Sequence, residues 1–471
     1  MTWLPRVVSR FLAVATAVTL TVSTAGPAAA QSAIRDTEIE GIIREWSDPV
    51  FTAIGLEPSE IEILLVGDNE LNAFATPGRV LGVNTGLILR TRNASELLGV
   101  IAHEAGHIKN RHTLRDGARD AGMQPMIMSM ALGALAIAAG SPTAGAALLG
   151  SGSYFGALGS LKYISQQEGE ADNSAARALE AAGESGRGLV EFFENFRSQE
   201  VFSEERRYPF FRSHPLSSAR IENLRRLVSE APHYGNVESP ARIAQHALVQ
   251  AKIQAFMDPP NQTLRTYPST DASIPGRYAR AIAWYRDGQT NRALAAVDAF
   301  IIEQPDNPYF WELKGQILFE ESRPVEAIEA HQRSVELKPD APLLRINLAH
   351  ALIETNDMGR LDQAVTELKR ATALERDNTL AWRLLSQAYA TQGKDGEARL
   401  ATAELYFAEG RQDQATQFAL RARDMLPRGS TEWIRAMDIV FASGATQDDI
   451  DAADERYRRD RPVRVIPADA G

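Results

Sequence analysis

A sequence period of about 34 residues, between residues 276 and 427, constrains the fold of this chain more than any other feature. Small residues recur at Ala293, Ala327, Ala364 and Ala398, with spacings of 34, 37 and 34. A unit of this length is too short to bury its own apolar face, so it stacks on its neighbours as one of a series of helix pairs. We therefore expect residues 276–427 to form an all-α array.

Two of these repeats carry a recognisable aromatic signature. Trp311 and Trp382 each lie 16 residues before the small residue of their repeat. The segment Trp382-x2-Leu385-Ser386-x2-Tyr389 is close to the tetratricopeptide pattern. Beyond Ala398 the phase slips by half a repeat, at Gly410 and Ala415. We therefore expect tetratricopeptide repeats whose last helix pair packs differently from the others.

The residues before the array predict a separate α+β domain, mostly helical with a small sheet, over residues 31–257. Residues 61–66 and 79–83 have the composition of strands. A helix is predicted to start at Ser95, as its N-cap, and to run to about Leu114. Residues 258–275, with four prolines, are predicted to be a linker. Residues 428–471 are expected to form a C-terminal helix and a disordered tail.

The first thirty residues have the pattern of a cleaved signal peptide. Arg6 and Arg10 precede an apolar stretch at residues 11–22, and Ala28-Ala29-Ala30 has the form of a cleavage site. We therefore expect the mature protein to work outside the cytoplasm. The absence of cysteine suits that compartment, because no wrong disulfide can form there.

Charge and composition exclude several classes of function. The formal net charge of −11 argues against a nucleic-acid partner. Without cysteine there is no thiolate metal site and no cysteine nucleophile. Residues 121–161 contain no charged side chain. Two interpretations of this segment stay open: a buried helical hairpin, or a lid or membrane-facing element that makes a peripheral contact with the membrane.

The chemistry is concentrated in His103-Glu104-Ala105-Gly106-His107, an H-E-x-x-H motif on the predicted helix. Histidines at i and i+4 share one helix face, so both imidazoles can reach one metal ion. Glu104 is one residue further round the helix, where its carboxylate can reach a water molecule on that metal. Two histidines leave a zinc ion short of a third protein ligand.

The third ligand is expected in Gln166-Gln167-Glu168-Gly169-Glu170-Ala171-Asp172. Glu168 and Asp172 are i and i+4 on one predicted helix face, whereas Glu170 points elsewhere. We assign Glu168 to one zinc ion per chain, and Asp172 to the second N–H of a ligand histidine. Glu170 as the ligand, or an acidic helix start without metal, are the alternatives.

These motifs together resemble the M48 family of gluzincin metallopeptidases. The resemblance rests on H-E-A-G-H, on Glu-x-Glu-Ala-Asp some sixty residues later, and on Asn72-Ala73-Phe74-Ala75 before Pro77-Gly78. It implies a periplasmic zinc endopeptidase in which Glu104 is the general base. The implied substrates are unfolded or misassembled envelope proteins, and the implied role of the repeats is to dock the substrate or the outer-membrane assembly machinery. This sequence departs from the family in its Gly- and Ala-rich apolar segment and in Gln166-Gln167, where relatives often have arginine.

The resemblance also singles out His214 and Arg220. His214-Pro215 lies in a polar loop predicted over residues 203–217, and Arg220 follows in the next helix, as in many M48 members. His214 is expected either to occupy the fourth position on zinc and inhibit the enzyme or to stabilise the oxyanion. A loop histidine without either role is the plainer alternative. His112, by contrast, is expected only to pack against the helix or cap it.

Two further functional interpretations remain. One is a non-proteolytic chaperone or adaptor for outer-membrane protein assembly that works through the repeats. Glu104 argues against it, because a structural metal site needs no base. The other is a membrane-embedded protease, which the lack of a 20-residue apolar span weakens. In the peptidase interpretation, residues 79–84 are expected to be the sheet edge that pairs with the substrate backbone.

Overall fold

The computed structural model describes residues 33–114, 152–197, 208–448, 450–451 and 455. The chain divides into two compact units. The first unit contains the residues up to Arg35 and residues 43–243, and the second contains residues 244–471 together with Asp36–Ile42. Helix α2 (Thr37–Ile54) therefore contributes its first turns to the second unit and the rest to the first.

The first unit contains a four-stranded sheet in the order β1-β2-β4-β3. Its strands are β1 (Ala33–Ile34), β2 (Glu62–Val66), β3 (Ala73–Thr76) and β4 (Val80–Asn84). β2 and β4 are parallel, and the other two pairs are antiparallel. β2 and β4 are the two predicted strands. Because β2 and β3 flank β4, the expectation that residues 79–84 form the sheet edge was wrong, and β3 is the edge strand.

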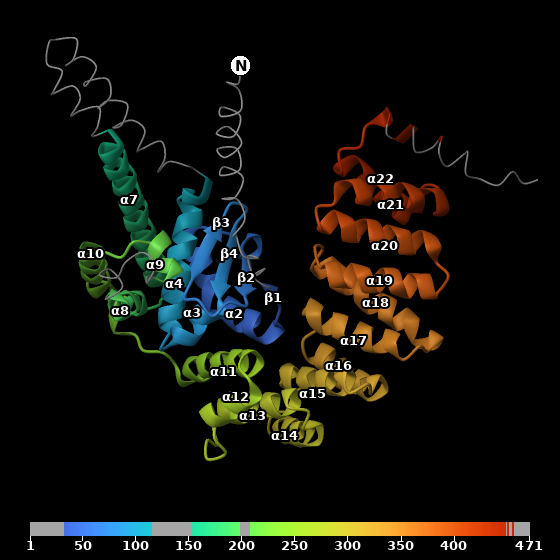
Figure 1. The fold of residues 1–471 in the computed structure, drawn as a ribbon, viewed down its shortest axis with the longest axis horizontal. Helices are drawn as coiled ribbons and strands as arrows, with labels where there is room; N and C mark the ends of the chain where they lie inside the picture. The colour runs from blue at the N-terminus through green and yellow to red at the C-terminus, as the bar shows by residue number, and fades with distance from the viewer. Residues whose placement is uncertain (1–32, 115–151, 198–207, 449, 452–454, 456–471) are drawn as a thin grey trace, which may run out of the picture. The chain divides into compact units, whose positions relative to one another are not determined.

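Among the described residues, helix α2 and nine further helical segments complete the first unit around this sheet (Figure 1). The further segments are η1 (Pro58–Glu60), α3 (Thr85–Arg90), α4 (Ala94–Lys109), η2 (His112–Leu114), α7 (Gly152–Ala181), α8 (Arg187–Asn195), α9 (Pro209–Ser213), α10 (Ser218–Ser229) and η5 (Pro232–Gly235). Helix α4 packs against β3, β4, α7 and α8, so it is the central helix of this unit.

The ends of α4 differ from the prediction. Asn93, not Ser95, is the N-cap, and its side chain accepts a hydrogen bond from the backbone N–H of Glu96 at 2.8 Å. The helix ends at Lys109 rather than near residue 114. Arg111 has a φ of 58°, in the left-handed region that terminates a helix, and the chain reverses there.

Several predicted segments lie outside the described residues. They are the signal peptide (1–30), the end of the tail (456–471) and most of the apolar segment 121–161, of which residues 152–161 begin α7. Among the described helices, none combines the length and the apolar character that crossing a membrane requires.

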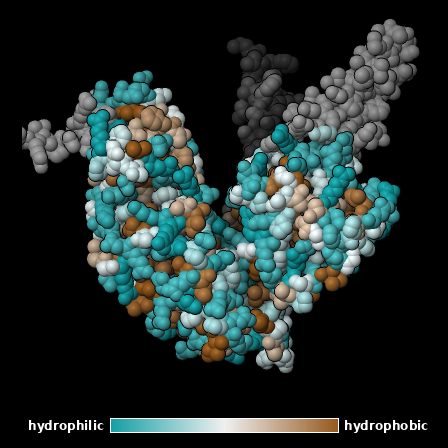
Figure 2. Space-filling model, turned by 180° about the vertical axis from the view of Figure 1, so that it is seen from behind, coloured by the Kyte–Doolittle hydropathy of each residue, from teal (hydrophilic) through white to brown (hydrophobic). Residues whose placement is uncertain are grey.

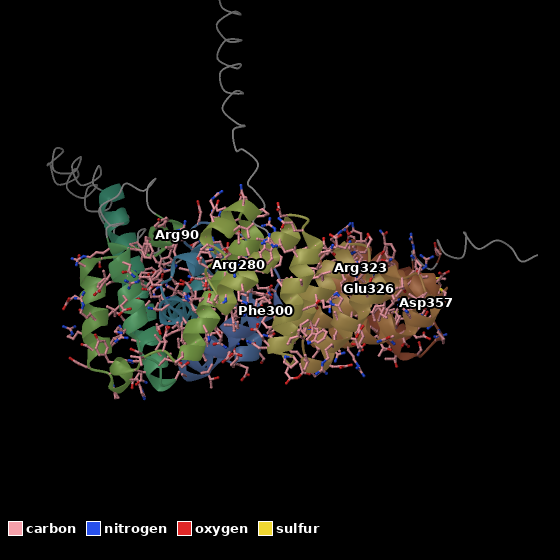
Figure 3. The ribbon with its side chains drawn as sticks, turned by 90° about the horizontal axis from the view of Figure 1, so that it is seen from below. Arg90, Arg280, Phe300, Arg323, Glu326 and Asp357 are labelled. Atoms are coloured by element: carbon pink, nitrogen blue, oxygen red, sulfur yellow. The ribbon has the colours of Figure 1, made fainter. Side chains whose placement is uncertain are left out.

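The second unit is all-α. Its helices are α11 (Pro240–Met257), α12 (Pro260–Thr266), α13 (Ile274–Arg286), α14 (Thr290–Glu303), α15 (Pro308–Glu320), α16 (Pro324–Leu337), α17 (Pro342–Glu354), α18 (Met358–Leu374), α19 (Thr379–Thr391), α20 (Asp395–Ala408), α21 (Gln412–Met425) and α22 (Thr431–Ala442). Helix α12 lies within the segment predicted as a linker. Arg280 of α13 (labelled in Figure 3) donates hydrogen bonds to the carbonyls of Pro268 and Asp271. These bonds attach the loop between α12 and α13 to the array.

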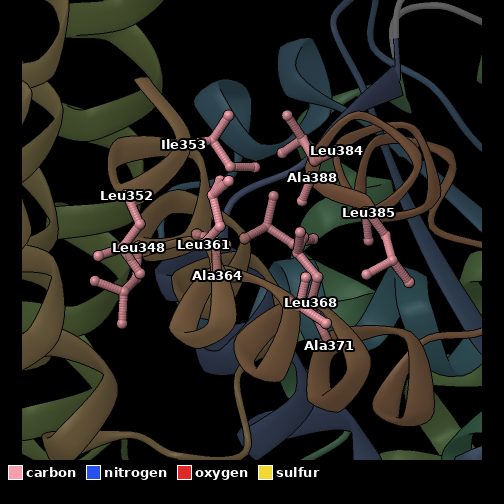
Figure 4. Close-up of a cluster of buried hydrophobic side chains, with 14 of the residues drawn as sticks. Leu348, Leu352, Ile353, Leu361, Ala364, Leu368, Ala371, Leu384, Leu385 and Ala388 are labelled. Atoms are coloured by element: carbon pink, nitrogen blue, oxygen red, sulfur yellow. The ribbon is translucent and has the colours of Figure 1, made fainter. Parts of the chain in front are cut away.

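The period of the array is visible in its turns. Each of the first four helix pairs reverses at one residue with positive φ, namely Gly288, Ser322, Asn356 and Gly393, spaced by 34, 34 and 37 residues. The last spacing contains the three extra residues of the third repeat. Between the helices, apolar side chains of α17, α18 and α19 interdigitate in one core, including Leu348, Leu361 and Leu384 (Figure 4).

The half-repeat slip after Ala398 changes how the last helices pack. Up to α19, the first helices of successive pairs contact one another, as α15 does with α17 and α17 with α19. From α20 onward the second helix of a pair makes this contact instead, because α20 packs on both α21 and α22. Gly410, with a φ of 72°, makes the extra turn between α20 and α21.

The visible surface of the described residues is mostly hydrophilic, with apolar side chains scattered over it (Figure 2). Exposed apolar residues such as Val325, Met358 and Phe441 lie on different helices of the array. Charged side chains pair locally, as Arg323 does with Glu326 at 2.6 Å (Figure 3).

Candidate metal centre

Helix α4 carries His103, Glu104 and His107 through the buried centre of the first unit, and all three side chains are buried. The i, i+4 spacing puts both imidazoles on the face that meets α7. Gly106 permits this close approach, because a Cβ there would lie 2.8 Å from the backbone oxygen of Ala171 on α7. The glycine of the motif therefore brings the acidic segment of α7 within reach of the histidines.

Four side chains, from two helices and one residue outside them, converge on a single point. They are His103 and His107 of α4, Glu168 of α7 and His214, the residue after α9. Nε2 of His103 lies 3.1 Å from Nε2 of His107, 3.4 Å from Nδ1 of His214 and 3.3 Å from a carboxylate oxygen of Glu168. The other oxygen of Glu168 lies 3.4 Å from His107 Nε2 and 3.1 Å from His214 Nδ1.

These separations fit a tetrahedral metal ion. A tetrahedral zinc ion with bonds of about 2.0–2.1 Å holds its ligand atoms about 3.3–3.4 Å apart. The contacts of 3.1–3.4 Å are close to that edge length, and all four ligand atoms lie within 4.8 Å of one another. Two imidazole Nε2 atoms that face each other at 3.1 Å are also unfavourable neighbours unless a proton or a cation lies between them. The donor set and its spacing therefore suit a zinc-sized ion.

Asp172 and Arg220 hold this donor set from behind. Nδ1 of His103 lies 2.9 Å from Asp172, so its Nε2 is directed at the cluster. Arg220 donates to both oxygens of Asp172 at 2.8 and 2.9 Å, and a third nitrogen lies 2.9 Å from Glu168. It also donates to the carbonyl of Pro215 at 2.7 Å, which ties the loop after His214 to the same network.

The network stabilises positive charge at its centre. Burial alone would lower the pKa of His103, but the carboxylates of Asp172 and Glu168 raise it to about 10. Burial and the charge of His103 lower the pKa of His107 to about 2. Burial would raise the pKa of Glu168, yet His214 and His103 hold it well below its ordinary value. The carboxylates of Asp172 and Glu168 therefore stabilise one positive charge within the cluster.

Glu104 is buried beside this cluster and has almost no partner of its own. Its Oε1 lies 3.4 Å from Nε2 of His214, and neither carboxylate oxygen is satisfied by a hydrogen bond among the described residues. An unsatisfied buried carboxylate is costly, so its retention indicates a chemical role rather than a structural one.

His214 is held more firmly than the predicted flexible loop implied. It follows the short helix α9, its backbone N–H donates to the carbonyl of Phe210 at 2.8 Å, and its ring lies 4.8 Å from the ring of Phe210. The structure therefore places Nδ1 of His214 among the candidate ligand atoms and Nε2 toward Glu104.

His112 has a contact that the sequence interpretation did not include. Its Nδ1 lies 3.0 Å from Nδ1 of His107, and its Nε2 lies 3.2 Å from Oε2 of Glu170. Glu170 therefore points away from the cluster, as expected from its helical position, but toward a histidine that touches it. The spacing of five residues after His107 gave no signal of this, because it depends on the reversal at Arg111.

The structure brings together all seven side chains that the sequence analysis predicted for the site. They are His103, Glu104, His107, Glu168, Asp172, His214 and Arg220. Their individual roles remain predictions.

Comparisons with known proteins agree with this geometry. Residues 33–228 match the model of peptidase family M48, and residues 290–432 match the cytochrome c-type biogenesis protein H TPR domain. The beta-barrel assembly-enhancing protease of Yersinia pestis is 26% identical over 400 residues, which are 84% of this chain and 80% of the relative. The protein of the same name from Escherichia coli K12 is 26% identical over 389 residues, 79% of this chain and 76% of the relative.

Among solved structures, MamA MSR-1 C2 is 19% identical and aligns with a TM-score of 0.30, covering 35% of this chain and 93% of that one. From the two family matches, residues 33–228 are an M48 peptidase domain and residues 290–432 a tetratricopeptide domain.

Proposed function

We propose that this protein is a periplasmic zinc endopeptidase that hydrolyses misassembled envelope proteins, with the repeats docking the substrate or the assembly machinery. The observation that carries the proposal is the cluster of His103, His107, Glu168 and His214, whose candidate ligand atoms lie within 4.8 Å of one another, beside the buried Glu104. The names of the relatives, which connect M48 chemistry to β-barrel assembly, support the choice of substrates. The signal peptide predicted in residues 1–30 supports the compartment.

His103, His107 and Glu168 are the proposed zinc ligands. Asp172 orients His103, and Arg220 holds both Asp172 and Glu168 in place. When bound, a zinc ion there would supply Lewis acidity, which lowers the pKa of a water molecule toward about 7 and polarises a carbonyl group. Glu104 would accept a proton from the attacking water, whose oxygen adds to the scissile carbonyl carbon, and would pass that proton to the amine that leaves when the C–N bond breaks.

His214 is proposed to restrain the enzyme. Its Nδ1 is within 3.1–3.4 Å of the ligand atoms of His103 and Glu168, which is where a fourth ligand stands. Catalysis requires that position to be free for water, so the arrangement corresponds to a latent form. Displacement of α9, which directly precedes His214, would open the position and bring the imidazole toward the oxyanion.

The edge strand β3 is the proposed site for the substrate backbone. Its outer edge has no strand partner among the described residues, and it packs against α4, which carries the motif. An extended peptide that adds to this edge gains main-chain hydrogen bonds, so affinity depends little on sequence. That property suits an enzyme for misassembled proteins.

Glu104→Gln tests the proposed chemistry. Glutamine keeps the shape of the side chain but cannot accept the proton, so hydrolysis should fall by a factor of at least about 10² while zinc content stays near one per chain. The measurement pairs digestion of a loosely folded protein with metal analysis. Glu70→Gln, an exposed glutamate of the same unit, is the control. Hydrolysis by Glu104→Gln at the wild-type rate would contradict the mechanism and favour a chaperone with a structural metal.

A further inference from the structure

The side chain of His107 has a neighbour that the proposed mechanism does not use. Its Nε2 faces the candidate ligand cluster, and its Nδ1 lies 3.0 Å from Nδ1 of His112. His112 in turn places Nε2 3.2 Å from Oε2 of Glu170. The imidazole of His112 is largely buried, with 8% of its side chain exposed, whereas Glu170 is about half exposed.

The N–H protons of His107 and His112 can be assigned to particular ring nitrogens in one consistent way. If Nε2 of His107 is a metal ligand, that ring is neutral and its only proton is on Nδ1. That N–H can donate to Nδ1 of His112, which is then an acceptor. His112, also neutral, carries its proton on Nε2 and donates it to Glu170. The two distances suit hydrogen bonds, and no group is left without its complement.

The backbone that presents His112 is specially shaped. Helix α4 ends at Lys109, and Arg111 adopts a left-handed φ of 58°, which non-glycine residues seldom do. Asn110 attaches the turn to α7 by donating to Oγ of Ser174 at 3.0 Å. This reversal brings His112 back onto the motif that precedes it. Strain of this kind persists where the surrounding contacts require it.

Glu170 is also held on its other side. Nε2 of Gln166 donates to its Oε1 at 2.9 Å, one helical turn earlier on α7. The carboxylate is therefore fixed between Gln166 and His112 although it is half exposed. This arrangement parallels that of His103, whose second nitrogen faces Asp172 at 2.9 Å.

We propose that His112 and Glu170 are positioning residues that fix the tautomer and the ring orientation of His107 for metal binding. The proposal rests on the proposed function in one respect, namely that His107 is a zinc ligand. It gives the two motif histidines different supports. A buried carboxylate holds His103, and a neutral imidazole backed by an outer carboxylate holds His107.

Zinc affinity of the full chain, measured by competition with a chelator, is the first test. His112→Ala removes the acceptor and should weaken zinc binding by about 10- to 100-fold. His112→Asn should recover most of the affinity, because its Oδ1 can occupy the position of the imidazole Nδ1 and accept the same proton. Glu170→Ala should have a smaller effect, because its carboxylate is half exposed and screened by water. Glu170→Gln, which retains an acceptor oxygen, should be nearer wild type.

His233→Ala is the matched control. His233 forms a comparable pair with Glu180 of α7 at 2.6 Å, in the same unit but without contact to a candidate ligand. Its loss should leave zinc affinity unchanged. If wild type binds no zinc, the proposed function fails. If wild type binds zinc and His112→Ala binds it equally well, only the positioning role fails.

A second measurement does not depend on any variant. In the zinc-loaded protein labelled with ¹⁵N-histidine, the proton on Nδ1 of His107 should be protected from exchange, and a nitrogen–nitrogen coupling should connect it to Nδ1 of His112. A rapidly exchanging proton without this coupling would overturn the proposal, even if His112→Ala failed to fold. A loss of affinity in His112→Ala that asparagine does not restore would likewise assign His112 a packing role alone.

Discussion

At the scale of single residues, one imidazole decides whether the candidate centre has three or four protein ligands. His214 is directed into the cluster by the turn after α9 and by its contact with Phe210. Arg220 donates hydrogen bonds to the carbonyl of Pro215 and to the carboxylate of Asp172, so it links the loop after His214 to the acidic side of the site. The position of His214 is therefore tied to the same residues that orient the proposed ligands.

We predict that His214→Ala increases the degradation of a loosely folded substrate. If the capped form exceeds the open form by about tenfold, removal of the cap raises the rate by about tenfold. Phe210→Ala, which loosens the same ring, should act in the same direction. The rates are measured with the Glu104→Gln variant of each as the blank. A fall in kcat of about 10²-fold would assign His214 to the oxyanion instead.

At the scale of elements, facing positions in the repeats are matched in size. Gly315 of α15 faces the buried ring of His331 on α16, and a Cβ at Gly315 would lie 2.6 Å from that ring. Seventy-one residues later, the equivalent pair is Ser386 and Thr402, whose hydroxyl oxygens lie 2.8 Å apart. In the first pair a glycine, which has no side chain, faces a large imidazole ring. In the second pair two small hydroxyl side chains face each other. Burial lowers the pKa of His331 to about 4, so its ring is neutral at pH 7.

This matching predicts a coupled pair of substitutions. Gly315→Ser should lower the free energy of unfolding by about 1–3 kcal/mol, because its side chain overlaps the ring of His331. Adding His331→Thr should recover at least about 1 kcal/mol, since it recreates the pair of the other repeat. Urea denaturation of the four members of the cycle measures this. Gly359→Ala, where a Cβ would lie 3.3 Å from Oδ1 of Asp357, should be nearly neutral. Strictly additive effects would contradict the match.

At the scale of the whole molecule, the second unit begins earlier than the repeats. Ala251 and Ala255 of α11 pack in one core with Tyr278 of α13. Lys252 of α11 is buried between Asp36 and Glu38, at 2.8 and 2.9 Å, and these carboxylates come from the start of α2. The fold of the array therefore depends on two segments outside residues 276–427.

We predict that residues 240–471 fold more stably than residues 276–471, because the shorter fragment loses α11 from its core. The shorter fragment also lacks Lys252. The longer fragment retains Lys252 and its acidic neighbour Glu312 but lacks Asp36 and Glu38, so Lys252→Met should cost less stability there than in the full chain, where it leaves Glu38 buried without its cation. Thermal denaturation of the longer fragment and of the full chain, each with and without the substitution, checks this difference. Equal stability of the two fragments would show that α11 is dispensable.

A binding test of the stable fragment with an unfolded envelope protein then examines the docking role of the repeats.

Much of this organisation is local, and local patterns are legible in a sequence. The period of 34 residues places a turn at Gly288, Ser322 and Asn356, because each helix pair repeats its own geometry. The spacing of His103 and His107, like that of Glu168 and Asp172, follows from 3.6 residues per helical turn. These patterns sufficed to predict an all-α array behind a mostly helical domain with a small sheet, and to nominate the side chains that the structure gathers.

Contacts between distant segments were decided by tertiary packing alone. The short strand β3 displaced β4 from the sheet edge, since strand order depends on which strands pair and not on their composition. The left-handed turn at Arg111 brought His112 onto His107, and α9 brought His214 from 111 residues away to within 3.4 Å of His103. A sequence records the chemistry of each group and its local geometry. The partner that each group meets across the core depends on how whole helices pack, and no local period encodes that.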